Sequence, residues 1–398
     1  MKDGAISIQK SAGVPLLDLK TEYKGIKSEV MRVIFEVCEK QHFILGPYVK
    51  RLEAEIAAYA QSRHGIAVSS GTDALLSSLM AIDVAPGEEV ITSPYSFFAT
   101  AGVVSRLGAR PLFCDIDSET YNLSACAVER FLANNCDYSG GVLRNRVTGG
   151  RIRVLMPVHL YGQCANMDEL LLLARLYDLA VVEDAAQAIG SECSGGRRAG
   201  SMGEIGCYSF FPSKNLGAFG DGGMCVTGND DLAERLRILR VHGAQPKYHH
   251  ALVGGNFRLD ELQAAVLTIK LPHLDAWTEA RQHNAQAYGE LFRTAGLEDQ
   301  IRLPVTLPGY RHIYNQYVIR VSDRDQLREH LRSANIGTEI YYPVPLHLQE
   351  CFRNLGGKDG DCPEAERAAR ETLALPVYPG LRQEQLEHVV STIARFYG

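Results

Sequence analysis

The residue whose surroundings most clearly indicate reactivity is Lys214, in the segment Ser209-Phe210-Phe211-Pro212-Ser213-Lys214. Aromatic residues precede it, and a glycine-rich loop at 217–223 follows it. An amine attacks a carbonyl only when it is neutral, and an apolar, partly desolvated setting lowers the pKa of a lysine toward that condition. The segment therefore indicates Schiff-base chemistry at Lys214. The alternative is a lysine that merely extends its stem from the end of a strand.

A carboxylate, Asp184, ends the run 179–184, whose first four residues are apolar, as is typical of a buried strand. Ligands of open α/β sheets bind at this carboxyl edge. A pyridine ring acts as an electron sink only while its nitrogen stays protonated, and a paired aspartate keeps it so. We interpret Asp184 as that aspartate, with capping of the next helix as the alternative. Side-chain alternation along the strand predicts that Glu183 points to the other face.

A third feature is the turn Ser70-Gly71-Thr72, which separates a strand pattern from a helix pattern. Free backbone N–H groups and the helix dipole at such a turn favour a phosphate. Many helices begin with Ser or Thr, so the turn alone is weak evidence for a phosphate site. Ser209, on the strand that leads to Lys214, can add a hydroxyl to the same phosphate site.

The elements that position these residues alternate between strand and helix patterns from about residue 65 to residue 228, as in an α/β domain. Short β-branched runs alternate with amphipathic stretches, which predicts βαβ units and a largely parallel sheet. The runs 207–211 and 223–227 are either an antiparallel pair or neighbouring strands. We expect strands at 65–68, 89–92, 109–115, 153–158 and 179–184, with helices at 73–80, 98–107 and 167–177.

The remainder of the chain predicts a second, smaller unit. We expect a large domain at residues 1–270 and a small C-terminal α+β domain at residues 271–398, because 398 residues exceed the size of one hydrophobic core. Glycines on both sides of 139–150 predict a mobile surface loop there. Further elements are expected as helices at 259–271, 273–295, 324–334 and 382–397 and a strand at 317–321.

Composition excludes several classes of function. The formal net charge of −6 gives no field that would gather nucleic acid or an anionic membrane. No run of about eighteen apolar residues occurs, and residues 1–11 lack the apolar stretch of a secretory signal, so we expect a cytoplasmic protein. The ten cysteines show no C-x-x-C pair and are expected to be reduced. His249 and His250 have no metal-ligand pattern around them, so no metal is expected.

Many ordered blocks of this chain resemble the DegT/DnrJ/EryC1/StrS family of sugar aminotransferases, which use pyridoxal 5'-phosphate (PLP). The resemblance implies fold type I of PLP enzymes, with a mostly parallel seven-stranded sheet between helices and a smaller C-terminal α+β domain. The blocks are Phe43-Ile44-Leu45-Gly46-Pro47, Ser70-Gly71-Thr72-Asp73-Ala74-Leu75, Pro94-Tyr95-Ser96-Phe97-Phe98-Ala99-Thr100, His159-Leu160-Tyr161-Gly162, Glu183-Asp184-Ala185-Ala186-Gln187, Ser209 to Lys214, Gly220-Asp221-Gly222-Gly223, Gly255 to Ala265, and Tyr342-Pro343-Val344-Pro345-Leu346-His347.

The resemblance assigns roles to individual residues. Lys214 carries the cofactor and moves the proton, and Asp184 binds the pyridine nitrogen. Gln187 touches the hydroxyl side of the ring. Phe97 stacks on the ring face, and we prefer it to Tyr95, which faces the same way on a strand.

The phosphate ligands implied by the resemblance come from two subunits. Gly71, Thr72 and Ser209 belong to the same chain, whereas Asn256 reaches the site of the other subunit in a homodimer. Without the resemblance, Asn256 reads only as a loop residue after two glycines.

The resemblance also implies a reaction. An amino acid, by analogy L-glutamate or glutamine, gives its amino group to the ketone of a sugar linked to UDP or dTDP. The stretches 248–250 and 255–260 look most like those of enzymes that make 3-amino sugars. Arg258 and His347 are candidates for the sugar or pyrophosphate side, and structural ion pairing or packing is the alternative for each. Two other functions stay open: a PLP-dependent sugar dehydratase, which lysine rather than histidine at 214 disfavours, and a non-catalytic nucleotide-sugar-binding regulator.

Overall fold

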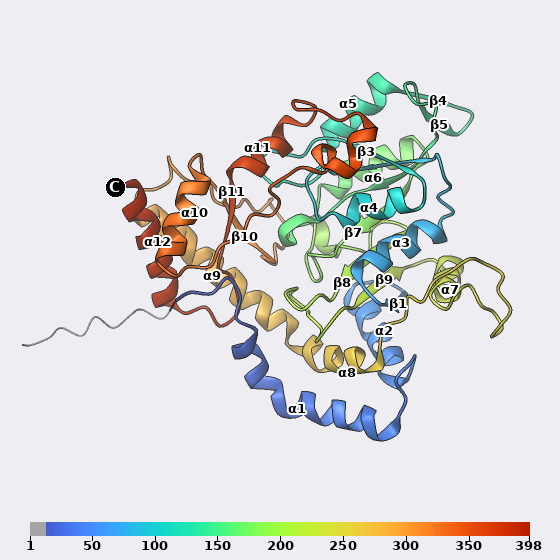
Figure 1. Cartoon of the computed structure of the whole chain (residues 1–398), viewed down its shortest axis with the longest axis horizontal. Helices are drawn as coiled ribbons and strands as arrows, with labels where there is room; N and C mark the ends of the chain where they lie inside the picture. The colour runs from blue at the N-terminus through green and yellow to red at the C-terminus, as the bar shows by residue number, and fades with distance from the viewer. Residues whose placement is uncertain (1–12) are drawn as a thin grey trace, which may run out of the picture.

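A seven-stranded sheet forms the centre of the molecule in a computed structural model that describes residues 13–398 (Figure 1). Strand β9 runs antiparallel to both of its neighbours, β1 and β8, whereas the other neighbouring pairs are parallel. The predicted α/β fold with a mostly parallel sheet is confirmed. In spatial order the strands are β1 (His64–Val68), β9 (Gly223–Thr227), β8 (Ile205–Ser209), β7 (Ala180–Asp184), β6 (Ile152–Met156), β2 (Glu89–Thr92) and β3 (Arg110–Phe113).

Helices cover both faces of this sheet, which explains why its strands are apolar on both sides. One face packs against α3 (Gly71–Ala81), α4 (Ala99–Arg106) and α7 (Asp230–Leu239). The other packs against α2 (Pro47–Tyr59), α5 (Ala125–Asn135), α6 (Met167–Leu176) and α8 (Glu261–Lys270). Successive strand residues alternate between these two cores.

Two helices precede the first strand, and the sequence reading did not identify either of them. Helix α1 (Leu19–Lys40) buries Ile26, Val30, Val33 and Val37, a helical spacing, and packs on α8. Helix α2 begins at Pro47, and the Glu261 carboxylate of α8 accepts hydrogen bonds from the backbone N–H groups of Tyr48 and Val49. An acid at a helix start satisfies N–H groups that have no partner inside the helix.

The C-terminal part contains a second core around a two-stranded antiparallel sheet, β10 (Tyr317–Arg320) with β11 (Thr372–Leu375). Helix α9 (Leu274–Thr294) runs from beside α8 toward α12 (Gln383–Tyr397), against which it packs (Figure 1). Helices α10 (Arg324–Ser333) and α11 (Pro363–Glu371) complete this part. The sequence reading missed α11 and β11, and the division at 270/271 stays a prediction. Short 3-10 helices lie at Leu160–Gly162, Ser194–Gly196, Leu271–His273, Leu346–Leu348 and Glu350–Leu355.

The stretch 139–150, predicted as a mobile surface loop, is not a loop throughout, because it contains strand β5 (Val142–Asn145) and the end of β4 (Cys136–Ser139). The two strands pair as an antiparallel hairpin. Gly140 and Gly141 form its two-residue turn, with φ of 60° and 75°. Positive φ at both positions is the geometry whose twist matches a hairpin, so the paired glycines mark a turn between strands. The runs 207–211 and 223–227 contain the antiparallel pair β8 and β9.

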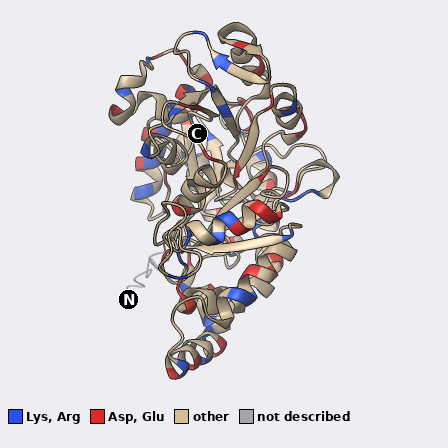
Figure 2. Ribbon diagram, turned by 90° about the vertical axis from the view of Figure 1, so that its right-hand side faces the viewer, with Lys and Arg blue, Asp and Glu red and all other residues tan. Residues whose placement is uncertain are grey.

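Charged residues of both signs are interspersed over the ribbon (Figure 2). Within residues 13–398 no helix combines the length and hydrophobicity needed to cross a membrane. In the same part of the chain no three His, Cys, Asp or Glu side chains gather as a metal site. All ten cysteines lie in this part and are free thiols. The stretch 1–11, examined above for a secretory signal, lies outside the described residues.

Candidate active site

The candidate residues singled out from the sequence lie at or after the carboxyl ends of four strands that point the same way. Gly71 comes after β1, Phe97 after β2, Asp184 ends β7 and Ser209 ends β8. Since strands that point the same way end at the same edge of a sheet, these residues converge on one side of the molecule. The edge is where an open α/β sheet binds its ligand.

Asp184 is buried at this edge and held by two hydrogen bonds. Its Oδ2 accepts from the Thr100 hydroxyl at 2.7 Å, and its Oδ1 accepts from the backbone N–H of Ala186 at 3.2 Å. Burial raises the pKa of the Asp184 carboxyl, while the Thr100 bond, the Ala186 bond and the nearby charge of Lys214 lower it. The site therefore contains a desolvated carboxylate that gains from a cationic partner.

Glu183 faces the opposite side of β7, as side-chain alternation predicted. It accepts hydrogen bonds from the backbone N–H groups of Gly200, Met202 and Gly203 and lies 2.8 Å from His159 Nε2. The His159 Nδ1 accepts from the Ala165 N–H, so Nε2 carries the proton and donates it to Glu183. This carboxylate holds loops together and does not contribute to the strand edge.

Lys214 lies in a compact loop that leaves the end of β8. The loop closes when the Ala218 N–H donates to the Phe210 carbonyl at 2.8 Å, and the Lys214 N–H donates to the Phe211 carbonyl. Burial lowers the pKa of Lys214 to about 8, although the nearby Asp184 charge opposes the shift. A lysine in this state has a substantial neutral fraction near physiological pH, which is the form that attacks a carbonyl.

The next residue ties this loop to the C-terminal part of the chain. Asn215 is buried, and its Nδ2 donates to the Ile313 carbonyl at 3.1 Å. Its Oδ1 accepts from Asn315 Nδ2 at 2.8 Å. These bonds attach the backbone that carries Lys214 to a segment that lies about one hundred residues later in the sequence.

A cradle for an anion lies where α3 begins. Ser70 caps α3 by accepting from the Asp73 N–H, so the first N–H groups, those of Gly71 and Thr72, have no partner inside the helix. A Cβ on Gly71 would lie 2.6 Å from Ser209 Cβ, so glycine is what allows α3 to approach this serine. Backbone donors and a hydroxyl thus meet at a helix N-terminus, which suits a phosphate.

An aromatic wall completes the edge. The Phe97 side chain is 58% exposed, and its ring centroid lies 6.2 Å from that of Tyr342. Gln187 is fixed between two tyrosines, accepting from the Tyr161 N–H at 2.7 Å and donating to the Tyr342 hydroxyl at 3.1 Å. No role was predicted for Tyr342, whose hydroxyl accepts from Gln187 and keeps its own proton to donate.

Tyr95 has a different task from Phe97. It is buried, and its hydroxyl donates to the Tyr341 carbonyl at 2.7 Å and lies 2.8 Å from Thr372 Oγ1. Its hydrogen bonds reach the C-terminal part, and only the Phe97 ring of the two is open to a ligand. The geometry supports the preference for Phe97.

Three further candidates come from other parts of the chain. Asn256 is exposed, and Arg258 is partly buried, forms a backbone bridge with Val68 and lines a hollow together with Ser70 at the start of α3. His347 is buried and lies 3.1 Å from Glu366, the ion-pairing alternative considered above. Their binding roles stay predictions.

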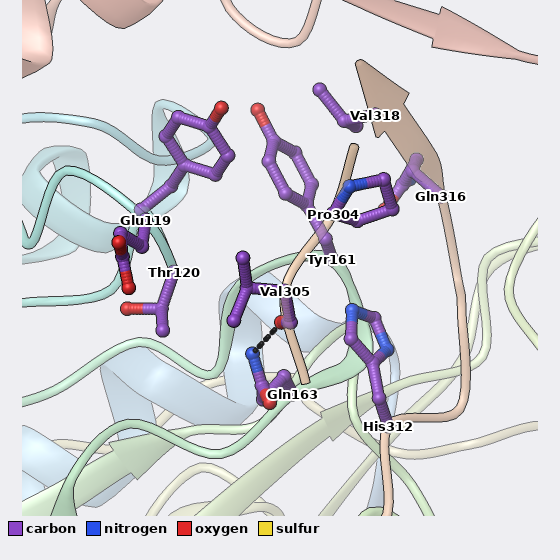
Figure 3. Close-up of a pocket in the computed structure, with 10 residues that line it drawn as sticks. Glu119, Thr120, Tyr161, Gln163, Pro304, Val305, His312, Gln316 and Val318 are labelled. Atoms are coloured by element: carbon purple, nitrogen blue, oxygen red, sulfur yellow. Dashed lines mark hydrogen bonds between the residues drawn. The ribbon is translucent and has the colours of Figure 1, made fainter. Parts of the chain in front are cut away.

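A small cavity lies behind the aromatic wall, and it is too small for a substrate. It measures about 10 Å³ and is lined by Tyr161, Val305, His312 and Gln316, with Gln163 bonded to the Val305 carbonyl (Figure 3). A volume of this size holds at most one water molecule. The open strand edge is therefore the better place for cofactor and substrate.

The residues at the edge fit PLP. The flat, exposed Phe97 ring suits the ring face of that cofactor, and the buried Asp184 carboxylate suits its ring nitrogen. Lys214, with its lowered pKa, suits the aldehyde carbon, and the cradle at Gly71 suits the phosphate. Lys214 and Asp184 would hold its reactive atoms, and Gly71, Thr72 and Ser209 its phosphate.

Two relatives match this chain over nearly its full length. It is 47% identical over 384 residues to a pleiotropic regulatory protein of Geobacillus stearothermophilus, with 96% of this chain and 98% of the relative covered. It is 39% identical over 386 residues to a UDP-N-acetyl-3-dehydro-alpha-D-glucosamine 3-aminotransferase of Acidithiobacillus ferrooxidans, with 97% and 98% covered.

Solved structures agree with these relatives. DesV of S. venezuelae, crystallised in complex with a ketimine intermediate, has a TM-score of 0.89 and 40% identity, covering 97% of this chain and 99% of its own. NtdA of Bacillus subtilis, with the cofactor PMP bound, has a TM-score of 0.84 and 27% identity, covering 97% and 87%. The fold is that of PLP enzymes of fold type I, and PLP is the cofactor.

The family profile covers the part of the chain that contains the site. The profile of the DegT/DnrJ/EryC1/StrS aminotransferase family matches residues 24–394, which include all the strand-edge residues described above. The chain belongs to the DegT/DnrJ/EryC1/StrS aminotransferase family.

Proposed function

We propose that this PLP-dependent aminotransferase moves an amino group from L-glutamate to the ketone of a nucleotide-linked hexose, at carbon 3 of the sugar. The observation that carries the proposal is the meeting of Lys214, with its lowered pKa, and buried Asp184 at one strand edge. The relative that acts on UDP-N-acetyl-3-dehydro-glucosamine supports the sugar and the position.

The residues at the edge have separate tasks in this reaction. PLP supplies the electron sink when a proton leaves the carbon that bears nitrogen. Lys214 takes this proton at Nζ and returns it, since a pKa of about 8 gives it access to both protonation states. Asp184 keeps the ring nitrogen protonated. Phe97 covers the ring face and Gln187 binds beside its hydroxyl.

The phosphate group is proposed to bind at the start of α3. Gly71, Thr72 and Ser209 supply donors from one subunit, and Asn256 supplies another from the partner subunit. Arg258 and His347 are proposed for the sugar or pyrophosphate side, although His347 contacts it only if its pairing with Glu366 opens.

A homodimer is part of the proposal, and exposed apolar side chains on one part of the chain support it. Met31 and Phe35 on α1 are 50% and 65% exposed, and Ile44 after α1 is 50% exposed. Burial of such side chains against a second copy is favourable. The cytoplasmic location expected from the sequence stays a prediction.

The visible spectrum of the purified protein tests the first half of the reaction. We expect a yellow band that bleaches when excess L-glutamate is added. Lys214→Arg keeps the cation but cannot hold the cofactor covalently, so this variant should lose the band and the bleaching. Lys50→Ala, an exposed lysine on α2, is the matched control.

The second half needs the bleached enzyme and a panel of sugars. UDP- and dTDP-linked 3-keto and 4-keto hexoses should be compared, and a 3-keto sugar should restore the band fastest. Return of the band only with 4-keto sugars would overturn the position. A protein that takes up no PLP would overturn the aminotransferase and favour a nucleotide-sugar-binding regulator.

A further inference from the structure

We propose that Thr100 is a positioning residue that holds Asp184 in place for the cofactor ring, with Ser96 as its support. The inference rests on the proposed function, because it concerns how the carboxylate serves the pyridine nitrogen. Thr100 lies in the first turn of α4, far in sequence from Asp184 on β7.

The direction of the hydrogen bonds follows from what each group can do. An ionised carboxylate only accepts, so the Thr100 hydroxyl donates its single proton to Asp184 Oδ2 at 2.7 Å. Ser96 Oγ lies 2.8 Å from Thr100 Oγ1, and Ser96 must then be the donor of that bond. Both hydroxyls are buried. The result is a chain that runs from Ser96 through Thr100 to the carboxylate, with each bond polarising the next.

This chain leaves room for the ring nitrogen. Each carboxylate oxygen accepts about two hydrogen bonds. Oδ2 accepts one from Thr100, and Oδ1 accepts one from the Ala186 N–H. A protonated ring nitrogen can therefore donate to either oxygen while the two existing bonds fix the plane of the carboxyl group.

The charges around Asp184 show why the hydroxyl matters. Burial raises its pKa, and the Thr100 bond is the largest of the effects that lower it. The charge of Lys214 also lowers it, whereas His159 is turned toward Glu183 and the nearby Tyr342 is a neutral phenol whose own pKa is raised by burial. Loss of the Thr100 hydroxyl therefore favours the neutral acid, which cannot hold a protonated ring nitrogen.

The same short segment also positions the ring face. The Thr100 N–H donates to the Phe97 carbonyl at 3.2 Å, so the residue that stacks and the residue that orients the acid share one turn. Two contacts to the cofactor, one on its face and one at its edge, are thereby fixed relative to each other by local backbone.

The test compares Thr100→Val, which keeps the shape and removes the hydroxyl, with Thr100→Ser, which keeps the hydroxyl. Thr268→Val is the matched control, since Thr268 is equally buried and its hydroxyl donates to the Ala265 carbonyl within α8. Two readouts are made on the holoenzyme: the rate of PLP loss in the presence of a PLP trap, and the pH titration of the visible band.

In Thr100→Val, PLP loss should be roughly 10-fold to 100-fold faster, the effect of one hydrogen bond to a charged group. The midpoint of the pH titration should shift to higher pH, because a ring nitrogen that is less often protonated makes the nitrogen contributed by Lys214 more basic. Thr100→Ser and Thr268→Val should match the unmodified protein in both readouts.

Equal PLP loss and an unchanged titration midpoint in Thr100→Val would overturn the inference. So would the same change in Thr100→Ser, because the effect would then come from side-chain shape. If the unmodified protein shows no visible band at all, the proposed function itself has failed. Near-UV circular dichroism of each variant confirms that it is folded, and Ser96→Ala, with a smaller expected effect of the same sign, replaces Thr100→Val if that variant does not fold.

Discussion

Two neighbouring carboxylates on β7 illustrate how position along a strand assigns a task to a residue. Glu183 is surrounded by three backbone N–H donors and His159, so its charge is fully used within the protein. Asp184 accepts one bond from a hydroxyl and one from an N–H, which leaves acceptor capacity on both of its oxygens. The first is a structural anchor, and the second can serve a ligand.

The pKa of Lys214 leads to a pH dependence that can be measured directly. Protein freed of its cofactor should take up PLP slowly below pH 8, because the amine is then mostly protonated and cannot attack the aldehyde. The rate should rise as pH passes through about 8 and then level off. The measurement is the initial growth of the visible band after PLP is added across a pH series. A rise centred near the ordinary lysine value of about 10.4 would show that burial does not lower this pKa.

At the scale of elements, the approach of α3 to the end of β8 builds the anion cradle. Gly71 begins the helix beside Ser209, and Gly223 of β9 lies against the Ser70 carbonyl, where a Cβ would come within 2.4 Å. Small residues on two elements thus allow a helix N-terminus and a strand end to share one ligand. Glycine is needed at both positions because the neighbouring atoms are close, and neither glycine has a positive φ.

Gly71→Ala should weaken PLP binding with little change in global stability. The added Cβ, 2.6 Å from Ser209 Cβ, forces the start of α3 away from the serine and separates the phosphate donors. We expect a rise in the PLP dissociation constant of roughly 10-fold or more, as for the loss of a hydrogen bond to a charged group. Fluorescence titration with PLP measures it.

Gly289→Ala is the control for this change. Gly289 lies within α9, and an added Cβ there meets nothing within 4 Å. This variant should bind PLP normally and gain about 0.5–1 kcal/mol of stability from better helix propensity. Equal PLP affinity in both variants would mean that the cradle does not bind the phosphate.

At the scale of the whole molecule, the proposed homodimer concerns surfaces that are exposed in the single chain. Asn256 is exposed in the single chain, and the α1 residues Met31 and Phe35 present apolar surface. A dimer that covers this surface can bring Asn256 to the site of the neighbouring subunit. An experiment can then show whether one subunit or two contribute residues to each active site.

Complementation between two inactive variants answers it. Lys214→Ala and Asn256→Ala subunits should each give weakly active or inactive homodimers. In a mixed dimer, the site that retains Lys214 receives an intact Asn256 from the partner, so activity should reappear at up to half of the normal value per dimer. Activity is measured after co-expression and separation by two affinity tags. If Asn256 serves its own chain, the mixed dimer stays inactive.

Local sequence patterns predicted most strands of the sheet and put the candidate residues at the strand ends. The apolar runs ending in Asp184 and Ser209, and the turn at Gly71, are local patterns, and parallel βαβ connections necessarily bring such strand ends to one edge. The family blocks added the cofactor and the role of Lys214. Local spacing also correctly separated Glu183 from Asp184, since side chains on a strand alternate.

The contacts between side chains far apart in the sequence could not be predicted from local patterns. Thr100 meets Asp184 across 84 residues, and Tyr342 meets Gln187 across 155. Local periodicity says which face of an element is buried, but these contacts depend on how whole elements pack, which no short window of sequence contains. For the same reason helices α1 and α2 were not predicted, because both pack on α8, which lies far along the chain. The β4–β5 hairpin is different: its pairing is local, and the Gly140-Gly141 turn was a sequence signal for it.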